Sequence, residues 1–327
     1  MPPAERMAPN KEGKEQILMA IISNGKQEQF TIPILFMVFN RPEITERTFN
    51  QIRQQRPLYL YIEADGYRMD KEGEREKCEQ VRAIVKNIDW PCTPKYLFRD
   101  MNLGCDKACK SAIDWFFNEI ECGIIIEDDC LPDPSFFPYC EELLDRYKKE
   151  EKIMMISGTN LKIESGASSY YFSKYGQIWG WATWKRAWIK YEPEMDINNK
   201  KIQFNTKEED KYWRNNFTTP YWDAQWAVYT MWLNKSFAIL PNRNLVTNIG
   251  FGKEATHYDD ENSITAGIAT KSMEFPMKHS REIVVDNKVD NEFFYKFYYQ
   301  SFYKRLSNIL RAGPKEVIKK ILGKIKT

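Results

Sequence analysis

The 327-residue chain has few histidines, and its cysteines lack the spacing of a metal site. It contains two histidines and seven cysteines, all seven cysteines lie between Cys78 and Cys140, and no two of them form a CxxC pair. An odd number of cysteines in this arrangement is typical of reduced thiols in a cytosolic protein. We therefore predict free thiols, with neither a disulfide framework nor a zinc site.

Long apolar runs and an excess of either charge are also absent. The 48 lysines and arginines nearly balance 46 aspartates and glutamates, so no basic field indicates a nucleic-acid partner. The apolar stretch 17–22 is far shorter than the roughly 20 residues that span a bilayer. We predict neither a signal peptide nor a transmembrane helix, and a cytoplasmic protein whose function depends on local sites.

Apolar and amphipathic segments alternate along the first half of the chain. Strand-like segments at 31–43, 58–66, 95–100 and 122–129 alternate with segments of helical spacing at 43–55, 72–88 and 107–120. This repeat implies right-handed crossovers and a parallel sheet, so the predicted class is α/β, Rossmann-like and doubly wound. In such sheets ligands bind beyond the carboxyl ends of the strands, where this chain carries polar and acidic residues.

The rest of the chain is less regular. We predict helices at 134–150 and 221–235, strands at 153–160 and 237–241, aromatic loops from 170 to 265, and two C-terminal helices. The predicted organisation is a loosely ordered leader over 1–29, a main domain over 30–285, and the C-terminal helices over 286–327. For Asn102-Leu103-Gly104 we favour a simple turn.

Three adjacent carboxylates, Glu127, Asp128 and Asp129, directly follow the apolar run 124–126. They repel one another, and a hard divalent cation would remove that repulsion. Mn²⁺ or Mg²⁺ typically takes one or two carboxylates and completes its shell with water and phosphate oxygens. The alternative is that the triplet caps the following turn and binds nothing. Its place after the fourth strand favours the metal.

Six motifs follow one another from about residue 32 to residue 257: "MVFNRP", "IEADG", "IIIEDDCLPDPSFF", "WGWATW", "YWDAQW" and "GFGKEATH". Their order and spacing resemble those of GT-A-fold glycosyltransferases. Within these, the chain is most similar to the N-acetylglucosaminyltransferase I group and its bacterial relatives. Taken singly most of these motifs are weak, whereas their shared order is specific.

The resemblance implies a GT-A catalytic domain that transfers a sugar, with inversion, from a nucleotide-diphosphate donor to a glycan or lipid-linked acceptor. UDP-N-acetylglucosamine is the first donor to test, and Mn²⁺ or Mg²⁺ is the expected cofactor. Asp129 would bind the metal, and Glu127 and Asp128 would contact the ribose or the donor sugar. Arg41 and Asp65 would hold the nucleoside.

A glycine-bearing loop over 250–257 would close over the diphosphate. The loop residues expected to contact the donor are Gly252, Lys253 and His257. His257 would supply a third metal ligand or a hydrogen bond to the diphosphate, and the alternative is a surface histidine. His279 has no such setting, and we interpret it as structural.

Asp223 in "YWDAQW" matches the position of the catalytic base. Direct displacement needs one carboxylate to take the proton of the acceptor hydroxyl, and the flanking tryptophans would raise the pKa of Asp223 by desolvation. The alternative is a helix N-cap, and the two roles are compatible. The expected acceptor or sugar wall consists of Trp179, Gly180, Trp181 and Trp222. At least two tryptophans between 179 and 222 are expected in the core.

The last segment, 304–326, interleaves basic residues with aliphatic ones. It predicts a peripheral contact with the inner face of the membrane, or else the solvated face of a helix that packs on the core. The aromatic run 293–303 is expected to pack on the body.

Two other functions remain open: a catalytically silent glycan-binding protein of the same fold, and a sugar nucleotidylyltransferase. The latter is disfavoured because no glycine-rich basic loop follows the first strand.

Overall fold

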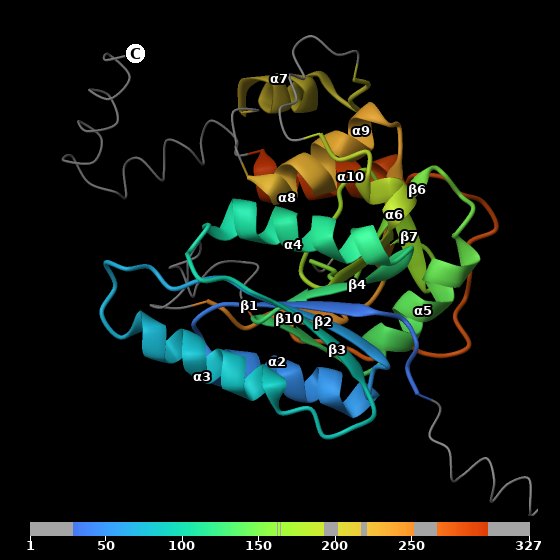
Figure 1. The fold of residues 1–327 in the computed structure, drawn as a ribbon. Helices are drawn as coiled ribbons and strands as arrows, with labels where there is room; N and C mark the ends of the chain where they lie inside the picture. The colour runs from blue at the N-terminus through green and yellow to red at the C-terminus, as the bar shows by residue number, and fades with distance from the viewer. Residues whose placement is uncertain are drawn as a thin grey trace, which may run out of the picture.

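A computed structural model describes residues 29–161, 163, 165–192, 202–216, 221–251 and 267–299. Within these residues an eight-stranded sheet has the order β3-β2-β1-β4-β8-β6-β9-β7, and helices cover both of its faces (Figure 1). The strands are β1 (Ile34–Val38), β2 (Tyr59–Ala64), β3 (Thr93–Phe98), β4 (Cys122–Glu127), β6 (Ile153–Ser157), β7 (Tyr170–Ser173), β8 (Trp181–Trp184) and β9 (Phe237–Pro241).

The first four strands confirm the predicted Rossmann-like half. Strands β3, β2, β1 and β4 are mutually parallel, and each crossover carries a helix. These helices are α2 (Pro42–Gln55), α3 (Glu74–Lys86) and α4 (Cys105–Glu119). Every residue of β1 is buried, as expected for an inner strand that is covered on both faces.

The second half turns the sheet into a mixed one. Strand β8 is antiparallel to both β4 and β6, β9 is parallel to β6, and β7 is antiparallel to β9. The strand predictions at 153–160 and 237–241 are confirmed as β6 and β9, whereas β7 and β8 were not predicted. Each has four residues, which is too short for a period of two to stand out from the surrounding aromatic loops.

The remaining helices are α5 (Phe136–Arg146), α6 (Lys185–Trp188), α7 (Lys207–Asn216), α8 (Trp222–Ala224), η2 (Gln225–Thr230), α9 (Met231–Leu233), α10 (Asn287–Phe293) and η3 (Phe294–Tyr298). The predicted helix at 221–235 is confirmed as the continuous run from α8 through the π-helical η2 to α9. The described part of the aromatic run, 293–299, packs on the body through the buried Phe293 and Phe294, whereas residues 300–303 lie outside the described residues.

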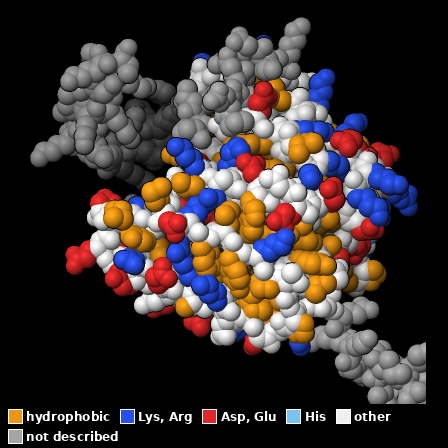
Figure 2. All heavy atoms as spheres, viewed as in Figure 1, with side chains coloured by type: hydrophobic (Ala, Val, Ile, Leu, Met, Phe, Trp, Pro, Cys, Tyr) orange, Lys and Arg blue, Asp and Glu red, His pale blue; other side chains and the backbone are white. Residues whose placement is uncertain are grey.

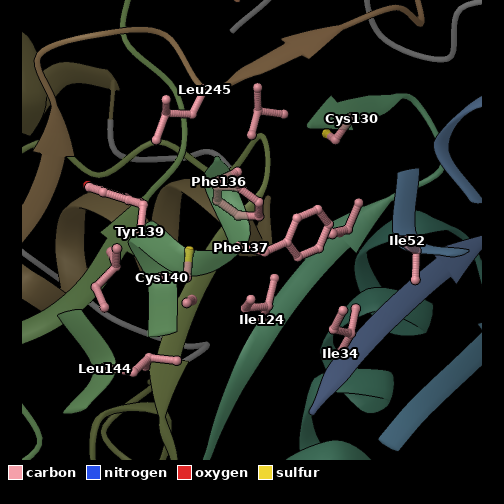
Figure 3. Packing of buried hydrophobic residues seen from close by; sticks show 14 of the residues in the cluster. Ile34, Ile52, Ile124, Cys130, Phe136, Phe137, Tyr139, Cys140, Leu144 and Leu245 are labelled. Atoms are coloured by element: carbon pink, nitrogen blue, oxygen red, sulfur yellow. The ribbon is translucent and has the colours of Figure 1, made fainter. Parts of the chain in front are cut away.

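Two hydrophobic cores lie on opposite faces of the sheet. Side chains of α5 pack against β4, β6 and β8 in one core, where Phe136, Phe137 and Ile124 are fully buried (Figure 3). Full burial of one such aliphatic or aromatic side chain contributes about 1.5–3 kcal/mol. The other core lies under α4 and contains most of the tryptophans. These cores fix the strands whose carboxyl ends carry the acidic triplet.

A small antiparallel ribbon, β5 (Cys130–Pro132) and β10 (Val246–Asn248), forms at the end of β4. Just beyond the paired strands, the Ile249 amide donates to the Asp129 carbonyl oxygen at 2.8 Å. The ribbon thus holds the acidic turn beside residues 249–251, where the predicted diphosphate loop begins.

The seven cysteines are all free thiols, as predicted. None of the described helices is both long and apolar enough to cross a bilayer. Residues 1–28 of the predicted leader over 1–29, the basic segment 304–326, and the loop residues 252–266 lie outside the described residues.

Candidate functional site

An arginine pairs with two of the three carboxylates of the acidic triplet at the carboxyl edge of the sheet. Arg41, three residues after the end of β1 and directly before α2, forms ion pairs with Asp128 and Asp129. Its Nη2 contacts Asp128 Oδ1 and lies 3.0 Å from Asp129 Oδ2, while its Nε lies 3.4 Å from Asp128 Oδ2. Asp128 is only 3% exposed, and Thr48 donates to its carbonyl oxygen at 2.7 Å.

The charge on this arginine is held firmly. Burial lowers the pKa of Arg41, but Asp128 and Asp129 together raise it by more, so its pKa lies above the ordinary arginine value. The guanidinium is therefore a permanent positive charge between two carboxylates. In this structure the positive charge beside the acidic triplet comes from the chain's own Arg41.

Glu127 links the triplet to the predicted base. Its Oε1 is buried and has no hydrogen-bond partner among the described residues. Burial raises the pKa of Glu127 well above its ordinary value, and the charges of Asp129 and Asp223 raise it further. Asp223 is therefore close enough to act on Glu127 electrostatically. The acidic triplet and the "YWDAQW" segment, far apart in sequence, therefore lie near each other in the fold.

Asp223 lies in the first turn of α8 and is not its N-cap. The helix begins at Trp222 with Tyr221 as the N-cap residue, and Asp223 Oδ1 accepts from the Ala224 amide at 2.8 Å. The N-cap interpretation is therefore wrong. The carboxylate at the helix start is Asp106 of α4, which accepts from the Trp222 amide at 3.1 Å.

Asp106 is a site residue that sequence reasoning missed. It lies in the first turn of α4, next to Cys105, and its bond to Trp222 joins α4 to the helix that carries Asp223. The only local signal is an acidic residue just after Gly104, which is a common feature of helix starts. Nothing in the local pattern indicates contact with a segment more than a hundred residues later.

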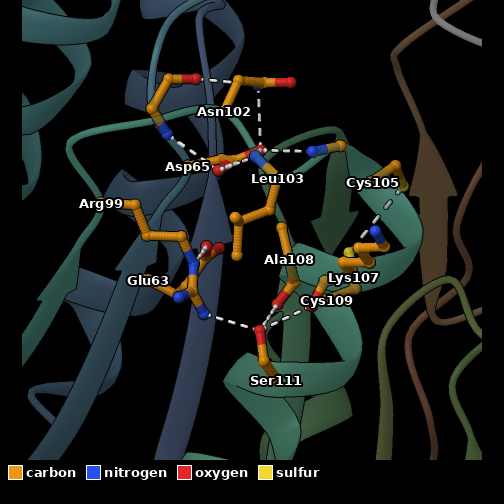
Figure 4. Close-up of polar contacts among 12 residues, drawn as sticks. Glu63, Asp65, Arg99, Asn102, Leu103, Cys105, Lys107, Ala108, Cys109 and Ser111 are labelled. Atoms are coloured by element: carbon orange, nitrogen blue, oxygen red, sulfur yellow. Dashed lines mark hydrogen bonds and ion pairs between the residues drawn. The ribbon is translucent and has the colours of Figure 1, made fainter.

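Asp65 holds a loop at the same edge of the sheet (Figure 4). Its carboxylate accepts from the backbone amides of Gly66, Leu103 and Gly104, at 2.9 to 3.1 Å, and from the Asn102 side chain at 3.0 Å. Residues 102–104, predicted to be a simple turn, form a loop without a regular hydrogen-bonded turn, and this loop is tied to the end of β2. Contact of Asp65 with a nucleoside stays a prediction.

A buried carboxylate that the sequence pattern did not single out lies two residues before Asp65. Glu63 is 2% exposed, and Arg99 Nε donates to it at 3.2 Å (Figure 4). Burial raises the pKa of Glu63 to about 8 even though Arg99 lowers it. Glu63 and Glu127 both lie beside Met37 in the register of β1. The binding edge therefore carries buried acidic groups on two strands.

The proposed sugar wall is only partly present. Trp181 is fully buried, and its ring packs against Trp188, Trp222 and Trp226 in the core. Trp222 is 4% exposed. The prediction that these two line a sugar site is corrected, because tight aromatic packing leaves their rings no free face. The expectation that at least two tryptophans are core residues is confirmed.

Gly180 and Trp179 occupy different settings. Gly180 has φ +62°, and a Cβ there would lie 2.7 Å from Val246 Cγ2, so packing against β10 accounts for the glycine without a sugar. Trp179 is half-buried, and its ring meets Phe251 edge-on with centroids 5.9 Å apart. Trp179 therefore lies at the start of the predicted loop, whereas Gly252, Lys253 and His257 lie outside the described residues.

The described residues offer oxygen ligands for a metal but no complete set. Within the described ranges, no group of three or more His, Cys, Asp or Glu side chains is arranged to hold an ion. The predicted third ligand, His257, lies outside those ranges. Asp129, with an exposed fraction of 15% for its side chain, fits a hard cation whose shell is completed by phosphate and water.

Comparison with known proteins does not identify the chain. No family model matches it, and no curated protein does. Among solved structures, a cytidylyltransferase from Leptospira borgpetersenii serovar Hardjo-bovis (strain JB197) is 10% identical, and the match covers 58% of this chain and 73% of that one. Its TM-score is 0.33, and at that value the likeness supports no conclusion about fold or function.

Proposed function

We propose that the protein is a metal-dependent inverting glycosyltransferase of the GT-A fold. It would move a sugar from a nucleotide-diphosphate donor, with a UDP-sugar favoured, to a glycan or lipid-linked acceptor. The observation that carries the proposal is the buried Oε1 of Glu127 at the carboxyl end of β4, which has no hydrogen-bond partner among the described residues. Burial raises the pKa of Glu127, and the charges of the neighbouring Asp129 and of Asp223 raise it further, which supports placing the expected metal ligand and the expected base near this group.

Each group in the site has a role that its surroundings support. Asp129, with His257, would hold Mn²⁺ or Mg²⁺, which would offset the negative charge that grows on the departing diphosphate. The buried oxygen of Glu127, which has no partner in the part of the chain that the structure describes, suits a hydrogen bond with a hydroxyl of the donor. Trp179 and Phe251 would form an apolar wall beside the donor.

The transfer needs no covalent intermediate on the protein. The acceptor oxygen would form a bond to the anomeric carbon while the bond from that carbon to the diphosphate oxygen breaks. The proton of the acceptor hydroxyl would pass to Asp223. Direct displacement of this kind inverts the anomeric configuration.

A thermal-shift panel of nucleotide sugars, with and without Mn²⁺, tests the proposal. We expect UDP-N-acetylglucosamine or another UDP-sugar to raise the melting temperature only with Mn²⁺, because a ligand at a hundredfold excess over its Kd stabilises the native state by about 2.7 kcal/mol. Asp129→Asn should lose that shift. Asp223→Asn should keep it, yet lose donor hydrolysis and transfer by about 10²–10⁴-fold.

Asp145→Asn is the matched control, because Asp145 is an exposed carboxylate on α5 whose side chain is 77% exposed. It should behave like the wild type. Failure of every nucleotide sugar to bind, together with binding of free glycans, would favour a silent glycan-binding protein. Release of pyrophosphate from a nucleoside triphosphate and a sugar phosphate would instead identify a nucleotidylyltransferase.

A further inference from the structure

Arg41 lies where the proposed function needs a metal and a diphosphate. Its Nη2 contacts Asp128 and lies 3.0 Å from Asp129 Oδ2, the carboxylate assigned to the ion. A guanidinium and a divalent cation repel each other, so both cannot occupy the same oxygen of Asp129. The arrangement in this structure therefore excludes an ion at Asp129 Oδ2 unless Arg41 moves away from it.

The surroundings of Arg41 show that this contact is built into the fold. Its carbonyl oxygen accepts from the Thr45 amide at 2.9 Å, which fixes its backbone at the start of α2. Gly250 closes the other side, because a Cβ there would lie 2.3 Å from Asp129 Oδ2 and 2.8 Å from Arg41 Nη1. A residue with any side chain at 250 would disturb the ion pair.

The two carboxylates hold Arg41 unequally. Asp128 is contacted by both Nε and Nη2, whereas Asp129 is contacted by Nη2 alone. Nη1 makes no hydrogen bond to the described residues and faces Gly250, where the predicted diphosphate loop begins. Arg41 can thus release Asp129, keep Asp128, and present its guanidinium to a phosphate, the group that arginine binds in bidentate fashion.

We propose that Arg41 is a placeholder cation that makes metal binding depend on the donor. Without donor, Arg41 pairs with Asp128 and Asp129 and occupies the position at Asp129 that the metal ion would take. When donor and metal arrive together, the diphosphate takes over the guanidinium and Asp129 is released to the ion. This role rests on the proposed function, since it presupposes a metal that is shared with a diphosphate.

Mn²⁺ binding without any turnover tests the placeholder. Free Mn²⁺ is measured by electron paramagnetic resonance during titration of wild type and Arg41→Gln, each with and without UDP. We expect wild type to bind Mn²⁺ alone weakly and to bind it more tightly with UDP. Arg41→Gln should bind Mn²⁺ alone at least about tenfold more tightly than wild type, because the competing charge is gone.

The matched control is Arg53→Gln, which removes the same charge at the far end of α2, where Arg53 pairs with Asp89 at 3.3 Å. It should bind Mn²⁺ like wild type. Adding Asp129→Asn to Arg41→Gln should abolish the gain. Should Arg41→Gln be too unstable to purify, Arg41→Lys keeps the charge but loses the forked contact, and it should show a smaller gain.

The outcomes separate this inference from the proposed function. If Arg41→Gln binds Mn²⁺ no better than wild type and Arg53→Gln, the placeholder is overturned, whatever UDP does. If UDP still raises Mn²⁺ affinity in that case, the metal-dependent transferase stands without the placeholder. If UDP binds only without metal and only when Arg41 is present, Arg41 is a permanent phosphate ligand, and both the placeholder and the metal are rejected.

Discussion

At the scale of single residues, the site is defined by buried charges and their partners. Asp128, Glu127 and Glu63 are all carboxylates at one edge of the sheet, yet each has a different setting. Asp128 is paired with Arg41, Glu63 is bonded to Arg99, and Glu127 has a buried oxygen with no partner among the described residues. An unsatisfied buried oxygen costs stability, so its presence favours a function in binding.

Glu63 makes stability depend on pH. Its pKa is raised from 4.5 to about 8 in the native state, mainly by burial. Between these two values the native state holds a proton that the unfolded state has lost, so the free energy of unfolding falls as the pH rises through this window. We expect Glu63→Gln to remove that decline, as measured by urea unfolding at a series of pH values from about 4.5 to about 8.

Glu121→Gln is the control for this series, because the Glu121 side chain is 88% exposed. Its pH profile should run parallel to that of the wild type. A Glu63→Gln profile that also runs parallel to the wild type would show that Glu63 is ionised in the native state throughout the window. In that case Arg99, rather than burial, would decide its protonation.

At the scale of elements, glycines mark where segments approach one another. Gly180 and Gly166 have nearly the same positive φ, +62° and +63°, but their surroundings differ. A Cβ at Gly180 would meet Val246 of β10 at 2.7 Å, whereas nothing lies within 4 Å of a Cβ at Gly166. Substitution of these two glycines by alanine therefore separates the energetic cost of backbone strain from that of a clash between residue 180 and Val246 of the ribbon.

We expect Gly166→Ala to lower the free energy of unfolding by about 1–2 kcal/mol through backbone strain alone. Gly180→Ala should cost about 1–3 kcal/mol more, because the added methyl group overpacks the contact with Val246. Guanidinium unfolding followed by tryptophan fluorescence measures both. Equal losses of unfolding free energy in the two variants would mean that Val246 of β10 moves aside at no cost. Glycine would then be needed at 180 only for its positive φ.

The same scale explains what could be predicted from the sequence. The strands β1, β2 and β4 were predictable because inner parallel strands are continuous apolar runs that end in polar turns. The ribbon of β5 and β10 was not, since each strand has three residues. The motif order placed Asp129 and Asp223 in one site, but the contact of Arg41 with the triplet and the bond from Trp222 to Asp106 depend on tertiary packing that no local pattern encodes.

At the scale of the whole molecule, the surface in view mixes charges of both signs with apolar patches (Figure 2). This agrees with the near balance of 48 basic and 46 acidic residues. Long-range steering by net charge is therefore weak, and recognition depends on local groups. The basic residues of the segment 304–326 are the exception along the sequence.

That basic segment leads to a prediction about membranes. We expect full-length protein to sediment with anionic vesicles and a truncation lacking residues 314–327 to remain in the supernatant, because lysines near an anionic surface contribute about 1 kcal/mol each. The attraction should weaken as salt is raised from 50 to 300 mM. Neutral vesicles are the control, and equal partitioning of both proteins on anionic vesicles would reject the membrane contact.

The ribbon of β5 and β10 limits how the site can change during evolution. It clamps the acidic turn to the strand that leads into residues 249–251, with Asp129 bonded to Ile249 across it. An insertion or deletion in either strand of the ribbon would move the acidic turn and residues 249–251 relative to the rest of the site. We therefore expect the spacing between the turn and these residues to stay constant among homologues. Under the proposed function, homologues that use different donor sugars are therefore expected to differ in side chains along the ribbon rather than in its length.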